Sequence, residues 1–395
     1  MGEFFVTFII HNSQFAIRHS SFVIRHSSFA MRVVIKFGTN LVASQNNTVN
    51  RPRLLEMVRQ MARLHAAGHQ IALVSSGAIF VGRRHFSNLP QRKDIPFKQM
   101  LAAIGQVKLL HIYEQLFDIY NITIAQALLT RGDLSNRGRY LNARNTLNML
   151  LERGVVPVVN ENDVVGVEEI KIGDNDNLSA LIANLVDADL LLILTDQPGL
   201  FTADPRTHAD AELIAEVPAI TDDIRALAAG SGTHMGVGGM ITKLQAAELA
   251  TRSGVDCVIA SGHEPDVLLR IVQNGEALGT RFRAKMSHIE SRKRWIITEP
   301  AHGILVADRG AKQAVVHNQR SLLSVGILSV EGNFARGDIV ILRDEAGNEI
   351  GRGVVNYGAQ DIQAIKGRHS KEIEAILGYN YGDTIIHRDN LVVTV

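Results

Sequence analysis

A regular alternation of short apolar runs with helical segments constrains the fold of this chain more than any other feature. The expected strands are 32–37, 71–74, 122–128, 155–159, 190–194 and 256–260. The expected helices are a first one capped by Asn50 and ended by Gly68, then 97–119, 137–153, 176–187, 239–252 and 265–273. This β/α alternation predicts an α/β fold, a three-layer αβα sandwich around a mostly parallel sheet.

Composition narrows the class of protein. Of the 395 residues, 46% are apolar and 21% are charged, which is typical of a globular protein. The 41 Lys and Arg residues nearly balance 40 Asp and Glu residues, which argues against a surface built to grip nucleic acid. The single cysteine, Cys257, excludes a disulfide framework and a Cys-based zinc cage, and we expect it in the core. With no apolar run long enough for a membrane span, we expect a cytoplasmic enzyme of small molecules.

Residues 1–30 do not match the rest of the chain. The heptad 15–21 (FAIRHSS) recurs almost unchanged at 22–28 (FVIRHSS). We expect this N-terminal extension to be translated repeat sequence outside the native structure, with the working protein starting at Met31. An organelle transit peptide stays open as an alternative, because the extension is rich in Arg and Ser and poor in acids.

The pattern changes after about residue 285, which separates an expected catalytic domain, 31–285, from a tail, 286–395. Short strands bounded by turn signals are expected in the tail at 303–307, 325–330, 338–342 and 353–357. Residues 346–348 (AGN) suggest a hairpin turn. We interpret the basic run 292–294 as the linker into a small all-β domain.

Polar clusters follow four of the expected strands. They are 36–40, 75–77, 160–163 and 195–196. Because ligands bind at the carboxyl ends of the strands in such sheets, we expect the functional site where these clusters meet.

Two lysines are candidates for binding phosphate. The glycine-rich stretch 230–239 leads into a helix that contains Lys243, and glycines allow backbone N–H groups to approach an anion. The alternative for this stretch is a flexible surface loop. Lys36 lies in an apolar strand, which is costly unless its amine reaches an anion or the strand lies at a sheet edge.

The acidic and amide residues of 173–177 and 160–163 exceed what helix capping requires. Such groups could orient the lysines or bind the amino group of a substrate. No histidine lies in these clusters, and phosphoryl transfer to a hydroxyl usually needs a base. A carboxylate acceptor is already ionised at neutral pH, so the missing base favours an enzyme that forms an acyl phosphate.

The ordered set of motifs resembles the amino-acid kinase family, and in particular its branch that phosphorylates L-glutamate. The motifs are 36–40 (KFGTN), 74–78 (VSSGA), 160–163 (NEND), 171–177 (KIGDNDN), 194–196 (LTD), 199–206 (GLFTADPR) and 238–243 (GGMITK). The segment 332–338 (GNFARGD) is similar to a PUA domain, which implies a small PUA-like barrel at the C-terminus.

This resemblance implies transfer of phosphate from ATP to the side-chain carboxylate of L-glutamate, giving L-glutamyl 5-phosphate in the first step of proline biosynthesis. It implies that Lys36 and Lys243 neutralise the transferring phosphoryl group while Asp176 holds both lysines. Glutamate would contact Ser76, Asp163 and Asn175. The implied ATP-binding residues are Lys36, Thr195, Asp196, Val237, Gly238, Gly239, Met240, Ile241, Thr242 and Lys243.

The resemblance also implies Mg²⁺, feedback inhibition by proline, a homo-oligomer (dimer or tetramer) and contact with the next enzyme, glutamyl-phosphate reductase. One departure is Val237, because family members commonly have Thr or Ser at that position. A backbone contact survives this change, so we expect altered ATP affinity at most.

Two alternatives stay open. Another amino-acid kinase, acting on acetylglutamate, aspartate or carbamate, would share the sheet and the lysines. An RNA-binding protein acting through the tail would need clustered cations, and the acidic residues of the tail dilute the run 292–294.

Overall fold

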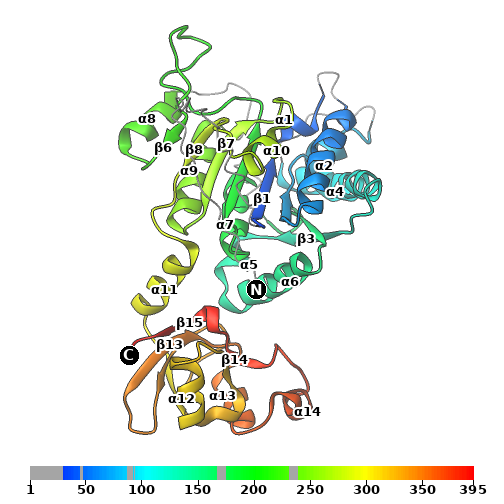
Figure 1. Cartoon of the computed structure of the whole chain (residues 1–395). Coiled ribbons are helices and arrows are strands. Elements are labelled where there is room, and N and C mark those ends of the chain that lie inside the picture. The colour runs from blue at the N-terminus through cyan, green and yellow to red at the C-terminus, as the bar shows by residue number, and fades with distance from the viewer. Residues whose placement is uncertain (1–29, 45–47, 87–91, 93, 167–174, 231–238) are drawn as a thin grey trace, which may run out of the picture.

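The computed structural model describes residues 30–44, 48–86, 92, 94–166, 175–230 and 239–395. Its main feature is an eight-stranded sheet with the strand order β3-β4-β2-β1-β5-β7-β8-β6 (Figure 1). The strands are β1 (Arg32–Phe37), β2 (Gln70–Val74), β3 (Ile124–Leu129), β4 (Val156–Glu161), β5 (Leu190–Thr195), β6 (Glu216–Val217), β7 (Asp256–Ser261) and β8 (Thr280–Phe282). The β7–β8 pair is antiparallel and the other pairs are parallel, so the mostly parallel sheet is confirmed.

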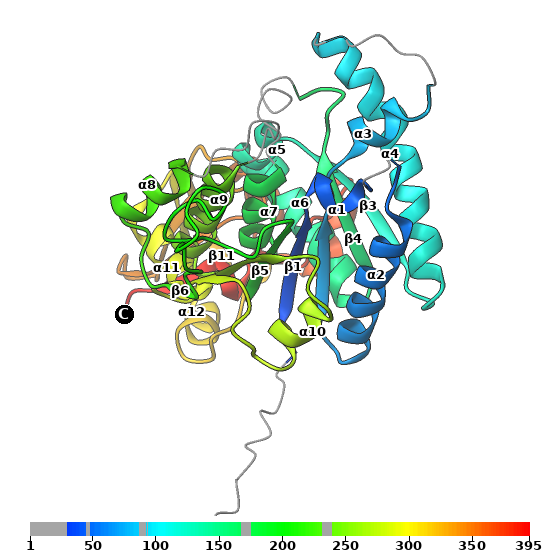
Figure 2. The ribbon, with the colours of Figure 1, turned by 90° about the horizontal axis from the view of Figure 1, so that it is seen from above.

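Helices cover both faces of this sheet. They are α1 (Thr39–Val42), α2 (Arg51–Ala66), α3 (Ala78–Arg83), α4 (Ile95–Asp118), α5 (Arg131–Ser135), α6 (Arg137–Glu152), α7 (Asn175–Leu185), α8 (Asp222–Gly230), α9 (Met240–Arg252) and α10 (Val267–Val272). Helices α2, α4 and α10 form one apolar core with the sheet, and α6, α7 and α9 form the other (Figure 2). The predicted three-layer sandwich is therefore confirmed.

Strand β1 lies in the middle of the sheet and divides its side chains between the two cores. Val33, Ile35 and Phe37 belong to the α2/α4/α10 core, whereas Val34 belongs to the α6/α7/α9 core. Because side chains alternate along a strand, Lys36 projects to the same face of the sheet as Val34, which is the face that α7 and α9 cover. The alternative of an edge-strand lysine is wrong, and Lys36 is 5% exposed.

Local signals explain the boundaries that the sequence predicts well. The side chain of Asn50 accepts a hydrogen bond from the backbone N–H of Arg53 and caps α2, and Gly68 ends the turn after it with a φ of 90°. The sequence pattern missed the short elements α1, α3, α5, β6 and β8, which have too few residues to show a period, and it also missed α8.

The tail contains a five-stranded sheet with the order β11-β9-β12-β13-β15 and the separate pair β10–β14. Its strands are β9 (Gly303–Ala307), β10 (Leu322–Leu323), β11 (Ile327–Gly332), β12 (Ile339–Arg343), β13 (Glu349–Val354), β14 (Thr384–Ile386) and β15 (Leu391–Val393). Gly347, with a φ of 85°, lies in the turn between β12 and β13, so the predicted hairpin turn is confirmed. The predicted β-sheet is thus present, but the strand predicted at 353–357 is wrong because β13 ends at Val354, and the sequence pattern missed α12 (Arg309–Val316), α13 (Ala359–Ile365) and α14 (Ile373–Leu377).

The basic run 292–294 lies in helix α11 (His288–Thr298), between the main sheet and the tail, so the segment that we interpret as a linker is helical. Ser287 and Glu290 form a capping box in which each side chain accepts from the other residue's backbone N–H, and this starts the helix. None of the helices in the described part of the chain combines the length and the apolarity needed to cross a membrane.

Helix α11 leads from the main sheet to the tail, and the two parts pack against each other (Figure 1). A small apolar cluster joins Leu141 of α6 and Ile296 of α11 to Ile339 and Val354 of the tail.

Helices α3 and α4 cross closely at Gly82 of α3 and Gly105 of α4, and this crossing predicts an effect on stability. A Cβ atom on Gly105 would lie 1.8 Å from the backbone oxygen of Ala78, a distance that no packing adjustment of side chains relieves. We expect Gly105→Ala to lower the free energy of unfolding by about 2–3 kcal/mol, as overpacking does. Gly138→Ala is the matched control, because a Cβ at this helical position would make only an ordinary contact, 3.5 Å from the Oδ1 of Asn136, and alanine is the better helix former there. Urea unfolding of both variants measures the difference, and equal stabilities would contradict the close crossing.

Candidate active site

The site centres on Asp176, whose carboxylate contacts two lysines. Oδ1 lies 2.5 Å from the Nζ of Lys36, and Oδ2 lies 3.4 Å from the Nζ of Lys243. The hydroxyl of Thr242 donates a 2.8 Å hydrogen bond to Oδ2. All four side chains are buried, and Asp176 is 1% exposed.

Three elements that are distant in sequence bring these groups together. Strand β1 projects Lys36 toward α7, whose first turn carries Asp176, and the neighbouring first turn of α9 carries Thr242 and Lys243. A carboxylate in the first turn of a helix is favoured by the helix dipole. Gly239 starts α9 as its N-cap, without a side chain between the helix end and the site.

Burial and charge act against each other at the triad, which is Lys36, Asp176 and Lys243. Burial works to raise the pKa of Asp176, but the charges of Lys36 and Lys243 outweigh it and hold the pKa below its ordinary value. Burial lowers the pKa of Lys243, and the charge of Asp176 offsets this in part. One carboxylate between two ammonium groups leaves the triad with a net positive charge when both lysines are protonated. The triad is therefore suited to receive an anion.

A second cluster lies beside it and is organised by Asn175. Its Nδ2 donates to the backbone oxygen of Ser75 at 3.0 Å, to the Oγ of Ser76 at 2.9 Å and to the Oδ1 of Asn160 at 3.0 Å. These contacts join the end of β2, the end of β4 and the start of α7 at one edge of the sheet. Asp163 lies in the turn that directly follows β4 and is half-buried.

A third cluster follows β5. The hydroxyl of Thr195 donates to Oδ1 of Asp196 at 2.9 Å, and the Nδ2 of Asn40 donates to Oδ2 at 3.0 Å. Partial burial works to raise the pKa of Asp196, but these two hydrogen bonds hold it below its ordinary value.

Of the residues that we expect to bind ATP, Gly239, Met240 and Ile241 occupy the start of α9 next to Thr242 and Lys243. Val237 and Gly238 lie outside the described residues, as do residues 231–236 of the expected phosphate-binding stretch and residues 171–174 of the motif 171–177.

The sequence reasoning missed two residues of these clusters as individual contributors. The Oε1 of Gln106 accepts a 2.8 Å hydrogen bond from Asn160, and Asn40 fixes Asp196. A signal existed for Gln106, because this polar residue falls on the buried face of α4 together with Leu109 and Tyr113. Among the residues described, no group of three or more His, Cys, Asp or Glu side chains could hold a metal ion.

Comparison with known proteins identifies the family of this chain. The chain matches the Amino acid kinase family over residues 31–261 and the PUA domain over residues 303–377. It therefore belongs to the amino acid kinase family.

Several curated relatives carry the name glutamate 5-kinase. The one from Deinococcus radiodurans is 54% identical over 92% of this chain and 100% of its own length. The one from Herpetosiphon aurantiacus is 51% identical over 92% of this chain and 98% of its own length. Among solved structures, carbamate kinase from Giardia lamblia bound to AMP-PNP matches with a TM-score of 0.47 and 20% identity, over 65% of this chain and 100% of that one.

The triad generates a prediction about stability. In Asp176→Asn, two buried ammonium groups would lose their shared carboxylate, and we expect a loss of about 3–5 kcal/mol in the free energy of unfolding. The matched control is Asp196→Asn, which removes an exposed carboxylate at the same sheet edge and should cost about 1 kcal/mol. Urea unfolding measures both, and a smaller loss in Asp176→Asn than in Asp196→Asn would refute the role of Asp176 as the shared counter-ion.

Proposed function

We propose that this chain is an ATP-dependent kinase of the side-chain carboxylate of L-glutamate, forming L-glutamyl 5-phosphate in the first step of proline biosynthesis. The observation that carries the proposal is the buried Lys36–Asp176–Lys243 triad at the carboxyl edge of the sheet. It occurs in a chain that matches proteins named glutamate 5-kinase from end to end of their sequences.

The reaction needs positive charge more than it needs a base. An oxygen of the glutamate carboxylate forms a bond to the γ-phosphorus of ATP, the bond from that phosphorus to the bridging oxygen breaks, and ADP leaves with the electron pair. The attacking carboxylate is already ionised at neutral pH, so no proton has to be removed. Negative charge gathers on the transferring group, and Lys36 and Lys243 are placed to neutralise it.

Asp176 is proposed as the positioning residue for both lysines. Its lowered pKa and the engagement of both oxygens argue against a role as general base. A carboxylate fixed by two cations and the Thr242 hydroxyl would hold the ammonium groups in place before substrates arrive.

The remaining clusters divide between the substrates. We assign Ser76, Asn175 and Asp163 to glutamate, because a hydroxyl and an amide suit its carboxylates and the Asp163 carboxylate suits its amino group. Thr195, Asp196 and the start of α9 are assigned to ATP, together with Val237 and Gly238.

We also propose that Mg²⁺ binds together with ATP. With no group of three acidic or His ligands among the described residues, the chain fits an ion that is held mainly by nucleotide phosphates. When bound, it would supply further neutralisation of phosphate charge. Inhibition by proline, a homo-oligomer, contact with glutamyl-phosphate reductase and a cytoplasmic location are also proposed, as is the division into a catalytic unit, 31–285, and a PUA-like unit, 286–395.

A coupled assay of ADP release with different acceptors tests the proposed substrate. We expect turnover with L-glutamate, and less than about a hundredth of that rate with aspartate or acetylglutamate at equal concentration, because a site that hydrogen-bonds one acceptor rejects its analogues strongly. Preferred turnover of acetylglutamate, aspartate or carbamate would reassign the chain to another acceptor within the same family.

Steady-state kinetics test the role of Lys243. Lys243→Ala should lower kcat by about 10²–10³, the usual cost of losing one group that stabilises developing charge, and change the KM for glutamate by less than about threefold. Lys108→Ala, an exposed lysine on α4, should leave both constants unchanged. A raised KM with unchanged kcat would assign Lys243 to substrate binding instead.

A further inference from the structure

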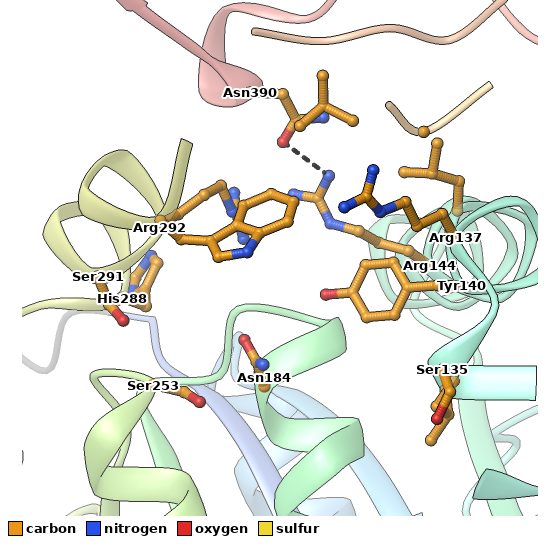
Figure 3. Close-up of a pocket in the computed structure, with 15 residues that line it drawn as sticks. Ser135, Arg137, Tyr140, Arg144, Asn184, Ser253, His288, Ser291, Arg292 and Asn390 are labelled. Atoms are coloured by element: carbon orange, nitrogen blue, oxygen red, sulfur yellow. Dashed lines mark hydrogen bonds between the residues drawn. The ribbon is translucent and has the colours of Figure 1, made fainter. Parts of the chain in front are cut away.

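A cavity of about 470 Å³ lies between the main sheet's helices and the tail (Figure 3), and no residue of the triad lines it. Helix α6 forms one wall, α11 forms the opposite wall, and the turn at Asn390 closes it from the tail. Asn184 and Ser253, at the C-terminal ends of α7 and α9, face it from the sheet side. Cavities of this size at domain junctions are common places for small ligands.

A buried guanidinium group, that of Arg144, and a half-buried one, that of Arg292, share one carboxylate in this cavity. Arg144 of α6 contacts Oδ2 of Asp187 at 2.9 Å, and Arg292 of α11 pairs with Oδ1 of the same residue. Arg144 also donates a 3.1 Å hydrogen bond to Asn390, yet its buried Nε has no hydrogen-bond partner within the described part of the chain. A third lining arginine, Arg137, differs because it pairs with Asp338 at 2.7 Å and with Glu299 at 3.8 Å.

Burial makes these two positive charges costly. It lowers the pKa of Arg144, and together with the nearby Arg144 charge it lowers the pKa of Arg292 to about 10. Burial also lowers the pKa of His288, so this neighbour adds little charge at neutral pH. The charge of Asp389 offsets part of this cost at both arginines, and an anion bound directly to the guanidinium groups would offset more of it.

The rest of the lining combines polar side chains with an apolar and aromatic part. Tyr140 lies beside Arg144 (Figure 3), and Trp295, Leu141 and Val354 also line this part of the cavity. Trp295 is 40% exposed, a large apolar surface to leave open to solvent. A ligand that matches both parts has a carboxylate or phosphate group and a flat apolar body.

The cavity is distinct from the catalytic site but connected to it. Helix α7 carries Asp176 in its first turn and Asn184 near its end, and its 11 residues span roughly 16 Å. Helix α9 carries Lys243 in its first turn, and Ser253 of the cavity is its C-cap. Asp187 follows α7 by two residues in a left-handed conformation, with a φ of 54°.

We propose that this cavity binds a small organic anion with an aromatic body, held between Arg144 and Arg292 and against Trp295. Because the anion competes with Asp187 for both arginines, its binding changes how the C-terminal end of α7 is held.

Trp295 gives a direct test, since it is the single tryptophan of the chain. The whole protein is first saturated with L-glutamate and Mg²⁺-AMP-PNP to fill the catalytic site, then titrated with phenyl phosphate or benzoate while tryptophan fluorescence is followed. We expect a saturable change with at least one probe, at a Kd below about 1 mM. The tighter of the two identifies the preferred anionic group. Inorganic phosphate, which lacks the apolar body, and benzyl alcohol, which lacks the charge, should each bind at least tenfold more weakly.

Variants locate the binding. Arg292→Met keeps most of the apolar stem and should weaken the probe at least tenfold, whereas Lys293→Ala, exposed on the same helix, should leave its Kd unchanged. Ser291→Phe keeps Arg144, Arg292 and Asp187 and fills the cavity, so it provides a second test if Arg292→Met fails to fold. The absence of a saturable change with both probes, or equal binding to the Ser291→Phe protein, would overturn the proposal. Neither result bears on the glutamate kinase activity, because the readout does not use turnover.

Discussion

The rest of this structure depends on one buried carboxylate that must face two ammonium groups at once. Lys36 comes from the central strand, Asp176 from the start of α7 and Lys243 from the start of α9, so their contact fixes two helices against the middle of the sheet. Removing any one partner would leave charge buried without its complement, which is among the most destabilising changes in a protein interior. The same arrangement leaves net positive charge where a phosphoryl group would transfer. Both the stability of the fold and the proposed chemistry therefore require these three side chains to stay in contact.

Sequence periodicity was sufficient for the layers of the main domain because its long elements carry strong local signals. The cap at Asn50, the turn at Gly68 and the apolar runs of the strands are all readable without tertiary information. The triad was predicted through family resemblance, since no local pattern says that Lys36 and Lys243 meet at Asp176. The role of Gln106 was not predicted, because its partner Asn160 lies on a strand that only the tertiary fold brings near.

The tail was predicted less completely for a physical reason. Its strands are short and its helices α12, α13 and α14 are five to eight residues long, so few residues report the period of each element. Nothing in the basic run 292–294 predicts that Arg292 pairs with Asp187, which is about a hundred residues earlier in the chain. Long-range ion pairs of this kind have no signature in a single sequence.

The central place of β1 has a consequence for how the chain is made. Strand β1, the first of the described strands, pairs with β2 on one side and with β5 on the other, and β5 pairs in turn with β7. Domains generally fold as units during synthesis, and non-local pairing is slow. This apolar strand therefore stays unpaired on one edge until β5, which ends at Thr195 in a chain of 395 residues, has been translated. Nascent chains of this protein should depend on chaperones over that interval. A truncated chain that ends before α9 would lack β7, β8 and Lys243, so both its main sheet and its site should be incomplete.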